Sequence, residues 1–180
     1  DKVVVQLKDE RLLLHKYLDA LFNKHSRASL KFHLLQVELY AEYETDKLFW
    51  FLEQSQSYDI EKALEICEGF LERCEENIKA LRDDTSPNSQ KAMRDEEEKR
   101  ARLYRSIVYL LGRMGNTNVA LHLIIDKLQD VKLAIEFVDK QRDAELWQDL
   151  IKYSLNNGTF IAGLLDHMAD SSNETLDHMD

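Results

Sequence analysis

Cysteine and histidine are the side chains with which nucleophilic or metal chemistry would begin in this 180-residue chain. Cys67 and Cys74 lie seven residues apart. This spacing puts them on one face of a predicted helix, with Cα atoms about 10 Å apart, beyond the reach of a disulfide. The six histidines are scattered and form no paired Cys/His set of the kind that holds zinc. We therefore expect both thiols to be small core side chains, and we predict no metal site.

The polar residues also lack a pattern typical of catalysis. The two glycines of LGRMGN, residues 111–116, follow no predicted strand and fit neither nucleotide-binding fingerprint, so a helix end explains them better. No carboxylate falls within an apolar stripe, where burial would raise its pKa. No serine or cysteine has a recognisable nucleophile setting. We predict that the protein is not an enzyme, with no catalytic residue, no cofactor and no small-molecule substrate.

Composition and charge narrow the class of protein further. The formal net charge is -10, which disfavours nucleic acid as a partner and direct binding to an anionic membrane. Only 5 glycines and 1 proline accompany 32% charged residues, which favours an all-α fold. No apolar run reaches the ~18 residues of a membrane helix. Because the chain begins with Asp1 rather than Met, we expect it to be a piece of a longer protein.

Apolar residues recur at helical spacing through the second half of the chain. They repeat at i, i+3, i+4 and i+7, one stripe per helix, with short polar breaks between the stripes. A helix with one apolar stripe must be covered by a neighbour, so this repetition predicts an α-solenoid of stacked helical hairpins. The expected core of the repeats consists of Ile107, Leu111, Leu121, Ile124, Ala134, Ile135, Trp147, Leu150 and Leu164.

The polar breaks predict where the helices of this region begin and end. Thr117, Asp130, Asp143 and Thr159 each precede a stripe, where a side-chain oxygen can accept a hydrogen bond from the first helical turn. Gly115 fits the left-handed position that follows a helix end.

We expect a single α-solenoid segment over residues 1–170 and a loose polar tail over 171–180. Residues 72–102 are predicted to form a protruding charged helical hairpin, because Met93 is the only large apolar residue between Lys91 and Arg102. The loop at its end, DDTSPNSQ, contains the proline. A stripe of alternating three- and four-residue steps favours a coiled-coil contact with a neighbouring helix: Leu64, Cys67, Leu71, Cys74, Ile78 and Leu81.

Three consecutive aromatic residues, Phe49, Trp50 and Phe51, cannot all face one core, because adjacent helical positions are about 100° apart. We expect Phe49 and Phe51 to be internal and Trp50 to be the exposed member. A neighbouring helix or a partner protein can cover such a ring, and both alternatives stay open. Trp50 is therefore the candidate partner contact.

Three segments resemble one known family: AEYETDKLFWFLEQSQSYDIEKALEIC, then YLLGRMGNTNVALHLIIDKLQDVKLAIEFVDKQRDAELWQDLIKYSL, then FIAGLL. They are similar to the clathrin heavy-chain repeat region of the vacuolar protein sorting-associated protein forty-one family, whose members are subunits of the HOPS tethering complex. The resemblance covers about Gln36 to Leu165. The insertion within residues 72–102 departs from the family pattern.

The resemblance implies a non-enzymatic protein-interaction solenoid that mediates subunit assembly or self-association. It implies a role in tethering vesicles and late endosomes to the lysosome or vacuole before membrane fusion, and in vacuolar protein sorting. The implied partners are other HOPS subunits and a second copy of the chain. The implied location is cytoplasmic, peripheral on late endosome, lysosome or vacuole membranes, with membrane association through partners. The alternative is a clathrin-like self-assembling coat component of vesicle transport.

Overall fold

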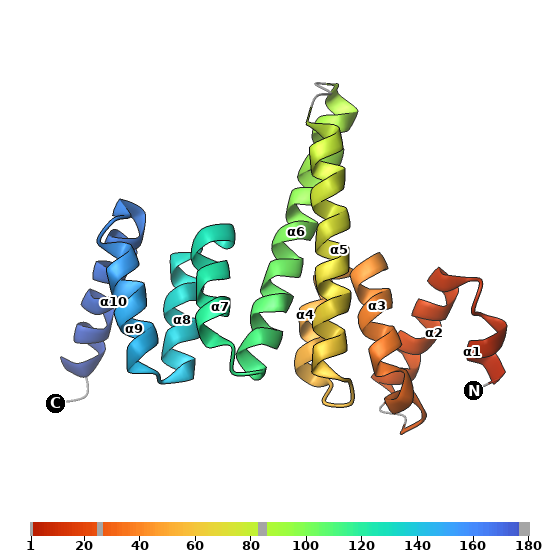
Figure 1. Ribbon diagram of the computed structural model, residues 1–180. Helices are drawn as coiled ribbons and strands as arrows, with labels where there is room; N and C mark the ends of the chain where they lie inside the picture. The colour runs from red at the N-terminus through yellow and green to blue at the C-terminus, as the bar shows by residue number, and fades with distance from the viewer. Residues whose placement is uncertain (1, 25–26, 83–85, 177–180) are drawn as a thin grey trace. The chain divides into compact units, whose positions relative to one another are not determined.

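The computed structural model describes residues 2–24, 27–82 and 86–176, and every regular element in these ranges is a helix (Figure 1). The chain divides into two compact units, residues 1–114 and 115–180. In each unit, helices pack against the next helix or the next but one along the chain. This arrangement confirms the predicted α-solenoid of stacked helical hairpins. The single segment expected over residues 1–170 stays a prediction.

The first unit is built around two long helices that form its final hairpin. Helix α2 packs on α3, α3 packs on α4 and α5, and both α4 and α5 pack on α6. Fully buried leucines of α2, α3, α4 and α6 contribute to the core of this unit, among them Leu18, Leu39, Leu52, Leu103 and Leu110. The elements of this unit are α1 (Lys2–Gln6), α2 (Arg11–Asn23), η1 (Arg27–Phe32), α3 (His33–Tyr43), α4 (Thr45–Gln54), α5 (Ile60–Leu81) and α6 (Pro87–Arg113).

The second unit contains shorter helices. Helix α7 runs directly into η2, a single π-helical turn, and Gln129 then ends it in the left-handed conformation, with φ 52°. Helices α7, α8 and α9 pack together, and α10 packs on α8 and α9. The elements of this unit are α7 (Thr117–Leu123), η2 (Ile124–Leu128), α8 (Val131–Gln141), α9 (Ala144–Ser154) and α10 (Gly158–Leu176).

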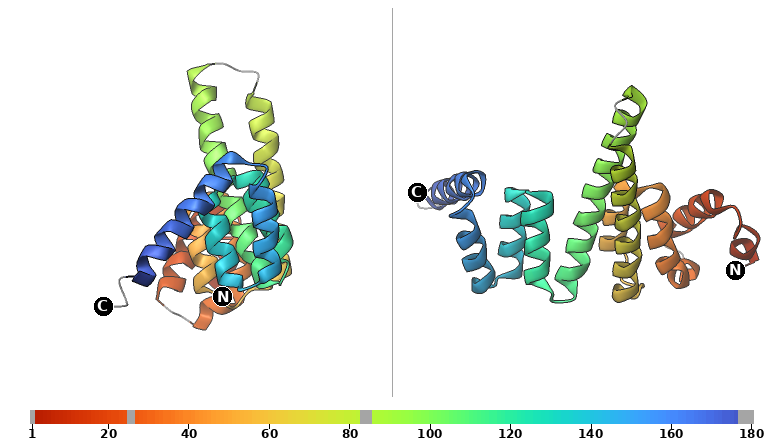
Figure 2. Two further views of the ribbon diagram at one scale, coloured as in Figure 1. Left: turned by 90° about the vertical axis from the view of Figure 1, so that its left-hand side faces the viewer. Right: turned by 45° about the horizontal axis from the view of Figure 1, so that its top comes forward.

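Helices α5 and α6 pack against each other as a hairpin, and residues 72–102 lie within it. Figures 1 and 2 show that its far end extends beyond the other helices of the first unit. Hydrogen bonds join the helices along this part. Among them, the Cys74 thiol donates to the Glu96 carbonyl at 3.0 Å, and the Tyr104 hydroxyl donates to Glu75 at 2.7 Å. The buried side chains of α5 are Ala63, Cys67, Phe70, Cys74 and Ile78.

Two of the predicted helix caps are confirmed. A carboxylate oxygen of Asp130 accepts a hydrogen bond from the Leu133 amide at 3.0 Å, and that of Asp143 accepts one from the Glu145 amide at 2.8 Å. Gly115 has a φ of 80° just after the end of α6, as expected for a residue that reverses the chain at a helix end.

The other two predicted caps are wrong by one or two positions. Thr117 is the first residue of α7 and follows Asn116, whose side chain makes no cap hydrogen bond. Helix α10 is capped by Asn157, whose side-chain oxygen accepts from the amides of Thr159 at 3.1 Å and Phe160 at 3.4 Å. Asn157 stands directly before the first residue of α10, whereas Thr159 is the second residue of the helix and is too late to cap it.

Helix α10 also ends later than expected. The backbone is helical through Leu176, so a loose tail beginning at residue 171 was predicted too early. Residues 177–180 of the predicted tail lie outside the described residues.

One close approach fixes the packing of α10 on α8. A Cβ atom added at Gly163 would lie 2.5 Å from Cγ1 and 3.2 Å from Cβ of Val131. These distances are too short for two carbon atoms, and a β-branched side chain in a helix has little freedom to rotate away. The two helices can therefore sit this close only because residue 163 has no side chain.

Replacing Gly163 by alanine tests this contact. We expect Gly163→Ala to lower the free energy of unfolding by about 1–3 kcal/mol, because the extra methyl overpacks the contact between α8 and α10. The matched control is Gly69→Ala, also within a helix but with open space at the Cβ position, which should raise stability by about 0.5–1 kcal/mol. Urea unfolding followed by circular dichroism measures both; equal stability gains would contradict the close approach.

Candidate interaction surface

The described residues contain no group of three or more histidine, cysteine, aspartate or glutamate side chains placed to hold a metal ion. Within the same residues, no helix has the length and apolar character needed to cross a membrane.

The two cysteines are structural, as the sequence predicts. Cys67 and Cys74 are free thiols at 0% and 2% exposure. Burial raises the pKa of both thiols to about 12, because the thiolate would lose its hydration. Both side chains therefore stay protonated near neutral pH and do not act as nucleophiles.

The structure contains a buried serine–histidine–serine cluster that the sequence did not predict. The imidazole of His33 lies between two hydroxyls, with Nε2 3.1 Å from Ser29 Oγ and Nδ1 2.6 Å from Ser55 Oγ. All three residues are at most 3% exposed. Ser29 and His33 have an i, i+4 spacing that can be found in the sequence. Ser55 is 22 residues further along the chain, and no local sequence pattern predicts its contact with His33.

This cluster cross-links the fold rather than forming a catalytic centre. The rings of Phe22 and Phe51 meet the His33 ring edge-on, with centroids 5.3 and 5.6 Å away. Burial lowers the pKa of His33, so the ring is neutral near pH 7 and donates one hydrogen bond while accepting the other. The serine hydroxyls are buried and beyond the reach of a substrate. The cluster ties η1 and the start of α3 to the residue that follows α4.

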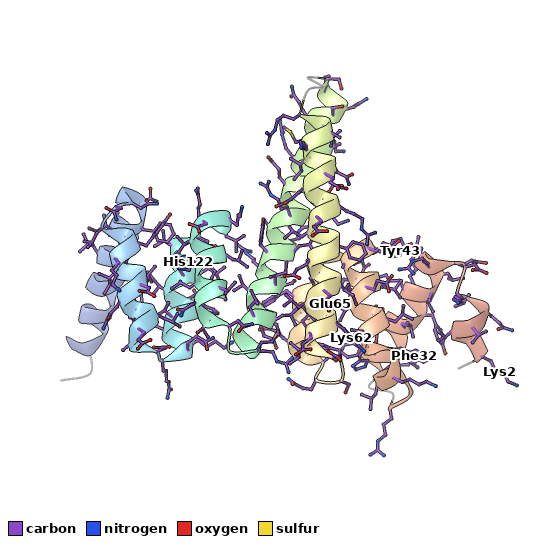
Figure 3. The ribbon with its side chains drawn as sticks, viewed as in Figure 1. Lys2, Phe32, Tyr43, Lys62, Glu65 and His122 are labelled. Carbon is purple, nitrogen blue, oxygen red and sulfur yellow. The ribbon has the colours of Figure 1, made fainter. Side chains whose placement is uncertain are left out.

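A second buried histidine joins α2 to α3. His15 is 2% exposed and packs edge-on against Tyr40, with ring centroids 4.9 Å apart. Tyr43, labelled at the end of α3 in Figure 3, stacks on its other side at 6.0 Å. Its Nε2 lies 3.3 Å from a carboxylate oxygen of Glu44, and the Tyr40 hydroxyl donates to Asp19 on α2. These contacts orient α3, and with it the helix that follows.

The predicted core of the repeats is buried with one exception. Eight of the nine residues are at most 8% exposed: Ile107, Leu111, Leu121, Ile124, Ala134, Ile135, Leu150 and Leu164. Trp147 is only half-buried, which corrects the prediction that it fills the core. Leu146 is fully buried instead. Leu146 and Leu150 share one face of α9 at i, i+4, and Trp147 lies about 100° away from Leu146 around the helix.

The aromatic residues of α4 provide an exposed surface. Phe51 is fully buried, whereas Trp50 is 43% and Phe49 is 38% exposed. The expectation that Phe49 is internal is therefore wrong. Each of these two exposed rings packs edge-on with one neighbouring ring. The centroids of Trp50 and Phe22 are 5.8 Å apart, and those of Phe49 and Tyr109 of α6 are 5.5 Å apart.

The surface continues from α4 onto the last turns of α6. The guanidinium group of Arg113 lies 5.8 Å from the Tyr109 ring centroid and 5.6 Å from that of Tyr58. It also donates to the Tyr58 hydroxyl at 2.8 Å and to the Gln56 side chain at 2.9 Å. Arg113 is thus held in place while half-exposed. We call Phe49, Trp50, Tyr109 and Arg113 the aromatic strip.

The aromatic strip combines the residue types that dominate protein–protein contacts. Tryptophan, tyrosine and arginine are enriched among interface residues with large binding energies, because they bury much apolar area and also form polar contacts. Asp46 and Glu53 are exposed on the turns of α4 before and after Trp50. Carboxylates beside an apolar surface favour a partner with basic side chains around an apolar centre.

The fold and this surface place the chain among helical-repeat proteins, in which stacked helices form an extended surface. The family model described as the Vps41 TPR-like region matches residues 1–93 and 75–177. The chain belongs to the Vps41 family.

Individual relatives agree with this assignment. The vacuolar protein sorting-associated protein 41 homologue of Danio rerio is 38% identical over 168 residues, which are 93% of this chain and 16% of that protein. The Arabidopsis thaliana homologue is 39% identical over 161 residues, 88% of this chain and 13% of that protein. The Saccharomyces cerevisiae protein is 33% identical over 129 residues, 72% of this chain and 10% of that protein. The chain thus spans about a sixth or less of their length. No solved structure matches it.

The buried His33 predicts a pH dependence of stability. Its pKa lies below 6.5 in the folded protein, so the unfolded chain binds the proton more tightly. The stabilising contribution is complete above pH 6.5 and is lost as the pH falls towards the lower folded pKa. We expect His33→Gln to be less stable at pH 7 but to lose less further stability between pH 7 and 5 than the unmodified chain.

Chemical denaturation at a series of pH values measures this difference. The control is Ser106→Ala, which removes a fully buried hydroxyl that donates to the Arg102 carbonyl at 3.2 Å and does not titrate. This variant should lose stability equally at every pH. Parallel pH profiles for His33→Gln and the unmodified chain would mean that His33 is accommodated in its charged form.

Proposed function

We propose that this segment is a non-catalytic interaction solenoid of a HOPS-type tethering subunit. It acts in vacuolar protein sorting, in the tethering of vesicles and late endosomes to the lysosome or vacuole before membrane fusion. Its part is to hold other subunits of the complex, and through them it associates with membranes from the cytoplasmic side. The observation that carries this proposal is the Vps41 family match, which extends over both units.

The chemistry of the described residues supports a binding role. The cysteines and the two buried histidines are enclosed within the first unit, where they contribute packing and hydrogen bonds. Phe49 and Trp50 of the aromatic strip are exposed aromatic rings. The match to a vacuolar sorting family also favours the tethering subunit over the clathrin-like coat component.

The aromatic strip is the proposed contact with another subunit, and Trp50 is its most exposed ring. The ring is pre-positioned by Phe22, and Arg113 is pre-positioned by Tyr58 and Gln56. Side chains that are already ordered lose little conformational entropy when a partner covers them. A partner segment with an apolar centre and basic flanks would bury the rings of Phe49 and Trp50 and pair with Asp46 and Glu53.

Binding of purified HOPS subunits to the immobilised 180-residue chain tests the function and the surface together. We expect at least one subunit to bind, and Trp50→Ala to weaken that binding about tenfold or more, because truncating a tryptophan ring that a partner buries can cost about 1.4 kcal/mol or more. The control is Val119→Ala, which truncates a 55% exposed side chain in the second unit and should bind like the unmodified chain.

Circular dichroism establishes that each variant keeps its helices before binding is compared. Failure of every subunit to bind the unmodified chain would overturn the proposed function. Unchanged binding by Trp50→Ala would leave the function standing and remove the aromatic strip as the contact.

A further inference from the structure

One hydroxyl side chain stands directly before the single proline of the chain. Ser86 is followed by Pro87 at the start of α6, at the far end of the α5–α6 hairpin. Figures 1 and 2 show that this end extends away from the other helices of the first unit. Ser86 is half-buried, and the two residues after it, Pro87 and Asn88, are exposed. An enzyme can therefore approach this serine without displacing another helix of that unit.

The backbone at this serine is already extended. Ser86 has φ -62° and ψ 149°, because the ring of a following proline excludes the helical conformation from the residue before it. Protein kinases bind the residue they modify in an extended conformation, and one large class of them requires proline immediately after it. Ser86 itself has both features, whereas the residues after it form the first turn of α6, so binding to a kinase requires that turn to open. No other serine or threonine in the sequence precedes a proline.

We propose that Ser86 is a phosphorylation site for a proline-directed serine/threonine kinase that uses MgATP. The Ser86 Oγ atom bonds to the γ-phosphorus of ATP, and the bond from that phosphorus to the β,γ-bridging oxygen breaks. ADP leaves with the electron pair of that bond. The hydroxyl proton passes to the catalytic aspartate of the kinase.

The phosphate would sit where the fold stabilises negative charge. Ser86 is the N-cap of α6, and its Oγ accepts a hydrogen bond from the Ser89 amide at 3.3 Å. Amide groups of a first helical turn carry partial positive charge, and phosphate oxygens accept their hydrogen bonds more strongly than a hydroxyl does. Modification therefore holds the start of α6 more firmly and adds about two negative charges at the end of the hairpin.

Phosphorylation of the folded 180-residue chain by a purified mitogen-activated protein kinase with MgATP tests the proposal. Mass spectrometry should find one phosphate per chain, on Ser86, and none on Ser86→Ala. The matched control is Ser89→Ala, which removes a serine from the same helix start that no proline follows and should be phosphorylated like the unmodified chain. Absence of phosphate from the unmodified chain, or equal phosphorylation of Ser86→Ala, would overturn the proposal.

Hydrogen exchange of the phosphorylated chain provides a second readout. The amides of the first turn of α6 should exchange several-fold more slowly after phosphorylation, whereas those of α9 should not change. Faster exchange in that turn would overturn the capping role of the phosphate. Because neither measurement uses another HOPS subunit, this proposal and the proposed function can fail separately.

Discussion

The packing of helices α2, α3 and α4 in the first unit depends on the buried ring of Phe51. Its centroid lies 4.8 Å from that of Phe22 on α2, 5.6 Å from that of His33 and 4.9 Å from that of Tyr40 on α3. One side chain of α4 thus joins three helices. Because adjacent helical residues are about 100° apart, placing Phe51 inward turns its neighbour Trp50 towards the edge of the core. The exposure of Trp50 therefore follows from the burial of Phe51.

Several reactive or titratable side chains have structural roles in the described residues. The Cys74 thiol and the Tyr104 hydroxyl join the two helices of the hairpin, and His33 joins three segments of the first unit. Each has exchanged contact with water for a protein partner, as buried polar groups must.

Features that arise within one or two helical turns could be predicted from the sequence. Asp130 and Asp143 cap their helices because a carboxylate reaches an amide two or three residues ahead. Gly115 reverses the chain because glycine adopts positive φ without strain. The threonines failed as caps because Asn157, two residues before Thr159, accepts the first-turn hydrogen bonds of α10, and because Thr117 already lies within the first turn of α7.

The sequence by itself determined that the chain is helical, where most helices lie, and which apolar stripe each helix must cover, since a period of 3.6 residues is a local property. Only the tertiary structure decided which side chain of a stripe reaches the centre. Leu146 is buried and Trp147 is not, because the neighbours of α9 leave room on one face alone. It also brought Ser55 to His33 and set Tyr109 against Phe49. Contacts between distant residues depend on the shape of two packed helices, and that shape exists only after folding.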